Sequence, residues 1–115
     1  DYREPTPPLI AYLESQHMEA IESGAAREIW LQDRVLSVHG EIQASYALEA
    51  QTDLRVDAPP PSEFLPMQLV TIFYPDGTAV FSTSQLIDKS SPGRDNVLYT
   101  IEVNPFDGDV IYYAP

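Results

Sequence analysis

The sequence predicts an α+β fold in which an N-terminal amphipathic α-helix packs on antiparallel β-sheets. Apolar residues recur at helical spacing before Gly24, they alternate with polar residues after it, and Asp-Gly pairs stand in two later turn-like segments. The change of spacing marks the boundary between helix and strands. We expect a single domain over residues 1–115, with the helix and an extended N-terminus in 1–24 and a β-rich head in 25–115.

The helix is predicted to cover roughly 16 residues and to end at Gly24, since glycine suits the position after a last helical turn. Thr6 followed by Pro7 is typical of an N-cap with proline in the first turn. The two faces differ in polarity, as in a helix that covers a sheet. The apolar face holds Leu9, Ile10, Leu13, His17, Ala20 and Ile21, and the polar face holds Glu14, Ser15, Glu19, Glu22 and Ser23.

Alternating apolar and polar residues predict the strands of the first half. We expect them at 27–32, 34–38, 42–48 and 52–56, with a helical turn over 47–51 as an alternative end for the third. Segment 57–66 contains four prolines, which cannot donate to a β-ladder. It is therefore expected to be an extended connector between two sheet regions.

The second half is predicted to form an antiparallel sheet of two strand-turn-strand units. Segment 68–74 is apolar on nearly both sides, as in a central strand, and 97–103 alternates as a half-buried strand does. Each unit turns on an Asp-Gly pair, at 76–77 and at 107–108. Glycine can adopt the positive φ that closes a short hairpin.

Composition narrows the classes of function. The formal net charge is −12, from 18 acidic and 6 basic residues, so we expect no nucleic-acid partner because phosphates would be repelled. The absence of cysteine excludes a thiol enzyme, a disulfide and a thiolate metal site. No run of about 18 apolar residues is present to span a membrane. Because the chain begins with Asp rather than Met, we expect an upstream segment.

Candidate chemical sites are few. His17 and His39 each stand alone without HExxH spacing, which is more typical of packing or of a solvated surface. No G-x-S-x-G elbow or phosphate-binding glycine loop occurs, so we expect neither catalysis nor a cofactor. Asn104, Asp107 and Asp109 are oxygen donors around a tight turn and would suit Ca²⁺, but they are ordinary turn residues without EF-hand spacing. We therefore expect no structural metal.

Three blocks follow one another along the chain: AIESG at 20–24, IFYPDGT at 72–78 and YTIEVNPFDGDV at 99–110. In this order they resemble the H-type minor pseudopilins of type II secretion systems and the related GspH/FimT minor pilins. That family has an AI-x-SG helix end, an I-x-F-x-PDGT hairpin and a closing Y-x-I-x-V block. Ordered blocks are more specific than any one of them alone. Segment 34–66 is not matched.

The resemblance implies a pilin-like fold, with the helix on two packed sheets, and a structural subunit that drives export of folded proteins through subunit packing. It also implies a periplasmic domain anchored in the inner membrane by an upstream apolar helix with a processed, methylated N-terminus. The implied partners are the major pseudopilin and the minor pseudopilins of the filament tip. Subunit contacts are expected on the lower helix, through Tyr2, Leu9, Tyr12 and Leu13. Alternatively, Leu9 and Leu13 face their own sheet.

Other functions stay open at this point. A minor type IV pilus subunit would share the fold, but many pilins carry a C-terminal disulfide, and its absence here favours a secretion pseudopilin. A periplasmic or secreted ligand-binding domain would hold its ligand in the concavity of a curved sheet. A hydrolase would need two carboxylates that converge in a cleft, with the pKa of one raised, and no spacing suggests such a pair.

Overall fold

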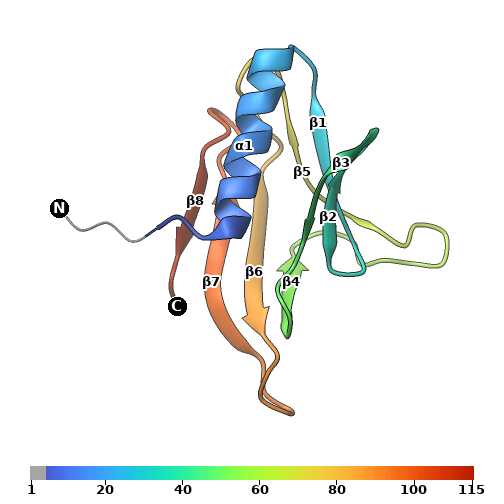
Figure 1. Cartoon of the computed structure of the whole chain (residues 1–115), viewed down its shortest axis with the longest axis vertical. Helices are drawn as coiled ribbons and strands as arrows, with labels where there is room; N and C mark the ends of the chain where they lie inside the picture. The colour runs from blue at the N-terminus through green and yellow to red at the C-terminus, as the bar shows by residue number, and fades with distance from the viewer. Residues whose placement is uncertain (1–4) are drawn as a thin grey trace.

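The computed structural model describes residues 5–115, apart from the side chain of Ile42. The described residues form one helix followed by eight strands, coloured along the chain in Figure 1. The helix α1 spans Pro8–Ser23. The strands are β1 (Arg27–Gln32), β2 (Val35–Val38), β3 (Glu41–Ala47), β4 (Thr52–Val56), β5 (Gln68–Phe73), β6 (Ser82–Asp88), β7 (Asn96–Val103) and β8 (Val110–Tyr113).

The helix has the predicted length of 16 residues and the predicted C-terminal glycine. Gly24 adopts φ 72°, and its N–H donates to the Ala20 carbonyl at 3.1 Å. The predicted Thr6 cap is wrong, because Pro7 occupies the N-cap position and no side chain among the described residues caps this end. Pro8 follows at the first helical position, where the missing N–H of proline has no intrahelical acceptor to lose.

The strands of the described chain form two antiparallel four-stranded sheets. The order is β3-β2-β1-β5 in the first sheet and β4-β6-β7-β8 in the second. The segment between β4 and β5 passes from the second sheet to the first, so the predicted connector is confirmed. The predicted start of the second strand at Arg34 is wrong, because Asp33 and Arg34 have φ of 50° and 64° and form the β1–β2 turn.

The two Asp-Gly turns differ in what they connect. The turn at 104–109 joins the paired strands β7 and β8, as predicted. The turn at 74–78 begins as a hairpin, with a Tyr74 N–H to Thr78 carbonyl bond of 2.9 Å and a bridge between Phe73 and Ala79. Beyond Ala79 the chain enters β6 of the second sheet, whereas β5 pairs with β1 in the first. The prediction of one C-terminal sheet is therefore wrong for β5.

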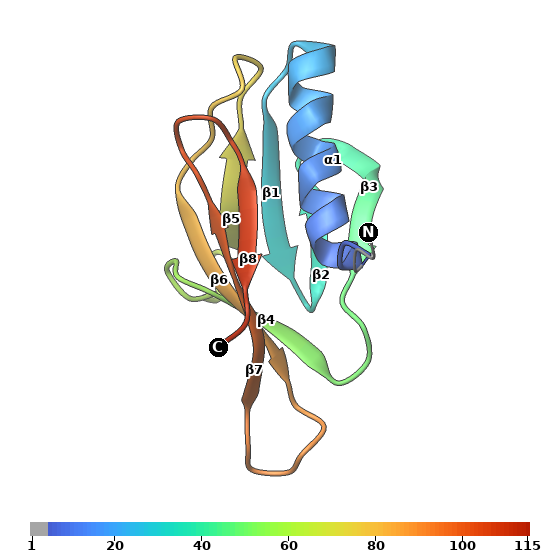
Figure 2. The same cartoon turned by 90° about the vertical axis from the view of Figure 1, so that its left-hand side faces the viewer.

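The helix lies beside β1 and contacts strands of both sheets (Figures 1 and 2). Its backbone lies close to β1 and β5 of the first sheet and to β8 of the second. No helix in the described stretch is long and apolar enough to cross a membrane. The β5–β6 and β7–β8 turns lie at the same end of the molecule, at the top of Figure 2, and the β6–β7 loop lies at the opposite end.

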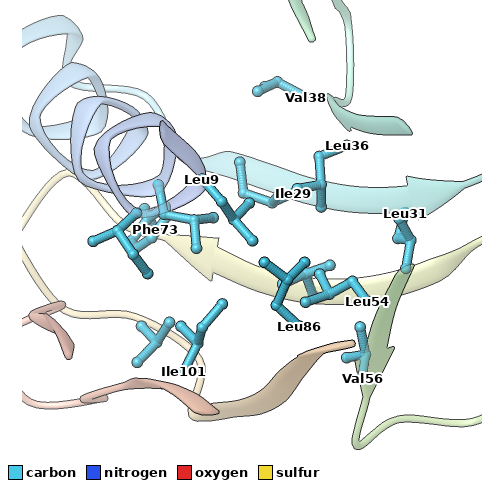
Figure 3. Packing of buried hydrophobic residues seen from close by; sticks show 14 of the residues in the cluster. Leu9, Ile29, Leu31, Leu36, Val38, Leu54, Val56, Phe73, Leu86 and Ile101 are labelled. Atoms are coloured by element: carbon cyan, nitrogen blue, oxygen red, sulfur yellow. The ribbon is translucent and has the colours of Figure 1, made fainter. Parts of the chain in front are cut away.

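The core lies where the helix and the inner faces of the two sheets meet. Figure 3 shows side chains from all three pointing toward one another. Thr71 is fully buried on β5, and its hydroxyl donates to the Val80 carbonyl at 2.7 Å. This hydrogen bond offsets the free energy lost when a polar group is buried in the core. The buried apolar cluster includes Leu9, Ile10, Leu13, Ala20, Ile29, Leu36, Phe73, Leu86, Ile101 and Val103.

Candidate subunit-contact surfaces

Two of the residues predicted to contact neighbouring subunits are buried inside the chain. Leu9 is 2% exposed and Leu13 is 1% exposed, and both belong to the core cluster. A side chain that fills its own core presents no apolar area to a second molecule. The prediction that Leu9 and Leu13 contact neighbouring subunits is therefore wrong. Both residues face their own sheets, which was the alternative. Tyr2 lies outside the described residues.

Tyr12 connects the helix to the first sheet. Its hydroxyl donates to the Ala44 carbonyl on β3 at 2.7 Å, and its ring lies 5.5 Å from that of Tyr46. Burial raises the pKa of the Tyr12 hydroxyl to about 12, against a smaller opposing effect of the Arg27 charge. The ring is only half-buried, so Tyr12 still has an exposed edge next to the helix start.

The exposed face of the helix carries both apolar and acidic side chains. Met18 is 50% exposed, opposite the buried row of Leu9, Leu13 and Ala20. Ile21 was predicted on the buried face but is also exposed, at 41%. The buried row instead includes a polar residue, Gln16, whose Oε1 accepts a hydrogen bond of 2.7 Å from Arg27 Nε. This partner on β1 explains why an amide is tolerated there, and sequence periodicity alone did not reveal it.

His17 lies where both Asp-Gly turns meet the helix. Its Nε2 lies 3.0 Å from the Gly77 carbonyl and donates to it, and its ring centroid lies 5.4 Å from that of Phe73. Gly108 of the second turn lies close against the same ring, since a Cβ built at this position would clash with His17 Nε2. His17 therefore holds the two turns against α1, which is a packing role. His39 is exposed at the β2–β3 turn.

The candidate calcium ligands have local roles in the β7–β8 turn. Asn104 Oδ1 accepts the Phe106 N–H at 2.8 Å, and Asp107 Oδ1 accepts the Asp109 N–H at 2.9 Å. Such side-chain-to-backbone bonds are what Asn and Asp contribute to turns. Among residues 5–115 no three His, Asp or Glu side chains gather closely enough to hold a metal ion.

Treatment of the chain with EDTA is expected to leave its melting temperature unchanged. The β7–β8 turn is already closed by its own hydrogen bonds, including Gly108 N–H to the Asn104 carbonyl at 2.8 Å, and needs no cation to order it. Thermal melts followed by circular dichroism, with EDTA and with added CaCl₂, test this. A lower melting temperature in EDTA, reproduced without EDTA by Asp109→Asn, would instead indicate a calcium site.

An apolar cleft of about 190 Å³ lies between the helix start and the two sheets. This is smaller than the roughly 300–1,000 Å³ of small-molecule sites. Burial, reinforced by Tyr46 and Glu49, raises the pKa of the Tyr99 hydroxyl in its wall to about 12. The cleft is lined by Pro8, Leu9, Tyr46, Leu48, Glu49, Thr52, Leu86, Leu98 and Tyr99. One carboxylate among apolar and hydroxyl groups does not form an acid–base pair.

The carboxyl groups of Asp76, in the β5–β6 turn, and Asp88, at the end of β6, also differ from catalytic acids. The pKa of the Asp76 carboxyl is lowered by hydrogen bonds from the side chain and backbone of Thr78. The pKa of Asp88 is lowered in the same way by Ser90. A general acid at neutral pH needs its pKa raised, so neither Asp76 nor Asp88 is suited to act as the acid of a hydrolase.

Comparison with known proteins gives a match in structure and none in sequence. No family model and no curated protein matches the chain. Among solved structures, it is similar to the minor pseudopilin EpsH from the Type 2 Secretion System of Vibrio cholerae, with a TM-score of 0.61 and 15% sequence identity. The match covers 93% of this chain and 91% of that chain. The chain therefore has the pilin-like α+β fold of this minor pseudopilin, an N-terminal helix packed on two antiparallel sheets.

Proposed function

We propose that this chain is the head of a minor pseudopilin, a structural subunit of a type II secretion pseudopilus, and not an enzyme. The likeness of fold to EpsH over nearly the whole of both chains is the observation that carries the proposal. The ordered sequence blocks at 20–24, 72–78 and 99–110 support it independently of the coordinates. In this role the protein works by packing against other pseudopilins, so that growth of the filament drives folded proteins across the outer membrane.

The helix is the element that suits such packing. One side of α1 is anchored in the core, and the other presents Met18 and Ile21 among the carboxylates of Glu14 and Glu22. We propose that this face, rather than Leu9 and Leu13, meets the helices of neighbouring subunits. In the complete protein we expect an apolar segment before residue 1 that anchors the chain in the inner membrane and leaves this head in the periplasm.

A functional test uses the full-length gene in the bacterium that encodes it. Deletion is expected to stop release of the exported proteins into the medium and leave them in the periplasm, and the wild-type gene is expected to restore release.

The encoded sequence before Asp1 is a second test. A short basic leader ending in Gly, then Phe or Met, a Glu at the fifth mature position and an unbroken apolar stretch are expected. An ordinary cleaved signal peptide would favour the ligand-binding domain instead.

The isolated chain is expected to be a monomer that associates weakly. Its net charge of −12 makes copies repel one another, and the core residues of the helix are already covered by its own sheets. Sedimentation velocity over a wide range of protein concentrations measures this. A tight symmetric dimer would contradict filament packing, because it would occupy the surfaces that other subunits need.

A further inference from the structure

A cluster of exposed apolar side chains lies at the turn end of the second sheet. Phe106 is 86% exposed in the β7–β8 turn, Phe81 precedes β6, and Ile111 lies on the outer face of β8. Together with Val103 and Pro105 they line a hollow of about 160 Å³. We call this the Phe106 surface. Exposed apolar side chains that surround a hollow, rather than standing singly, are typical of a site of protein association.

Hydrogen bonds hold the backbone that carries the Phe106 surface. Asn104 Oδ1 accepts the Phe106 N–H at 2.8 Å, and the Pro105 carbonyl accepts the Ala79 N–H at 3.1 Å, which ties the two turns together. On the neighbouring strands the Tyr113 hydroxyl donates to Glu102 Oε1 at 2.9 Å. A backbone that is already ordered loses little conformational entropy when a partner binds.

One carboxylate lies in the hollow of the Phe106 surface and two more lie in the same turn. Glu102 lines the hollow, and Asp107 and Asp109 follow in the same turn. The β6–β7 loop lies at the far end of the same sheet. Ser82 pairs with Val103 at the end near Phe106, and Asp88 pairs with Asn96 at the end near the loop.

The cations of the second sheet gather at that far end. Arg55 and Lys89 lie 3.5 Å and 4.0 Å from the Asp95 carboxylate, and Arg94 lies in the same loop. On the first sheet, Arg27 is engaged with Gln16 of the helix. The cations near Asp95 are therefore partly neutralised where they stand and are remote from the carboxylates around Phe106.

We propose that the Phe106 surface docks another protein subunit that presents an apolar side chain flanked by Lys or Arg. The apolar side chain would enter the hollow, and the cations would pair with Glu102, Asp107 and Asp109. A second copy of this chain is the wrong occupant, because its net charge is −12 and two of its exposed cations, Arg55 and Lys89, already face Asp95. This inference rests on the proposed function, in which the partner is a different pseudopilin of the same assembly.

Binding of the purified head domains of the other pseudopilins, one at a time, tests the docking surface. Calorimetry with the whole chain gives each Kd at about 50 mM and about 300 mM NaCl. One head is expected to bind, more weakly at the higher salt concentration. Phe106→Ser is expected to raise its Kd about tenfold or more, as loss of a central aromatic anchor does. Asp109→Asn is expected to raise Kd mainly at low salt.

Matched controls are available on the connector between β4 and β5. Phe64 is 89% exposed, nearly the same as Phe106, and Glu63 beside it is an exposed carboxylate. This connector projects on the opposite side of the molecule from β8 (Figure 1). Phe64→Ser and Glu63→Gln are therefore expected to leave Kd unchanged, while removing the same apolar area and the same charge.

The outcomes separate this inference from the proposed function. If a head binds but Phe106→Ser leaves its Kd within about twofold, the docking surface is wrong and the pseudopilin role stands. If no head binds, the docking surface is again wrong, and the secretion test with the full-length gene decides the role by itself. If wild-type chain forms a dimer that Phe106→Ser disrupts, a second copy is the occupant and the basic partner is wrong.

Discussion

Gly108→Ala is expected to lower the free energy of unfolding by about 2–5 kcal/mol, from backbone strain and overpacking together. Gly108 has φ 72°, where side-chain-bearing residues are strained. A Cβ at this position would also lie 2.3 Å from His17 Nε2 and 2.5 Å from the Gly77 carbonyl oxygen. One added methyl group would therefore push apart the two Asp-Gly turns and the helix at the point where all three meet.

Gly93→Ala is the matched control for this substitution. Gly93 has φ 71°, and a Cβ built there meets no described atom within 4 Å. Its expected cost is therefore the backbone strain alone, about 1 kcal/mol. Urea unfolding of both variants gives the comparison, and equal losses would contradict the close contact. In Gly108→Ala, a second change His17→Ala is expected to recover part of the loss, since it removes one of the two clashing groups.

The sequence predicted the positions of the helix and strands better than it predicted which strands pair with one another. The helix, its terminal glycine and the strands β1 and β4 lie where the periodicity placed them, because helical and strand spacings are local properties of the chain. The pairing of β5 with β1 is not local. The Pro75-Asp76-Gly77 turn determines that the chain reverses, but the sheet that β6 joins depends on contacts with β4 and β7. Turn chemistry therefore predicted a hairpin where the chain changes sheets.

The residues expected to contact other subunits were harder to predict from the sequence than the helix and strands. An amphipathic pattern identifies an apolar face but not what covers it. On α1 that face, including Leu9 and Leu13, is covered by the chain's own sheets. Met18 on the polar side of the helix and Phe106 in a turn are exposed apolar residues that carry no periodic signal. Phe106 is placed by the Asx geometry of Asn104, which a sequence indicates only as a turn.

Leu13→Ala is expected to lower the free energy of unfolding of the isolated chain by about 2–5 kcal/mol, as loss of a fully buried leucine does. Leu13 is 1% exposed and packs in the cluster that joins α1 to both sheets. Met18→Ala is the control on the same helix, because Met18 is 50% exposed and alanine preserves helix propensity. Its expected effect is within about 0.5 kcal/mol. Thermal or urea unfolding of the two variants measures the difference.

The comparison decides which side of α1 is available to other subunits. If Leu13 were a subunit contact, its truncation would leave the stability of the isolated chain unchanged and affect only assembly. If it anchors the helix, stability falls before any partner is added, and α1 is rigidly attached to its own head. In the role proposed above, a rigid attachment would transmit force applied along α1 to the sheets rather than lose it in a hinge. The same variants expressed in the full-length protein should therefore differ in abundance, with Leu13→Ala reduced and Met18→Ala at the wild-type level.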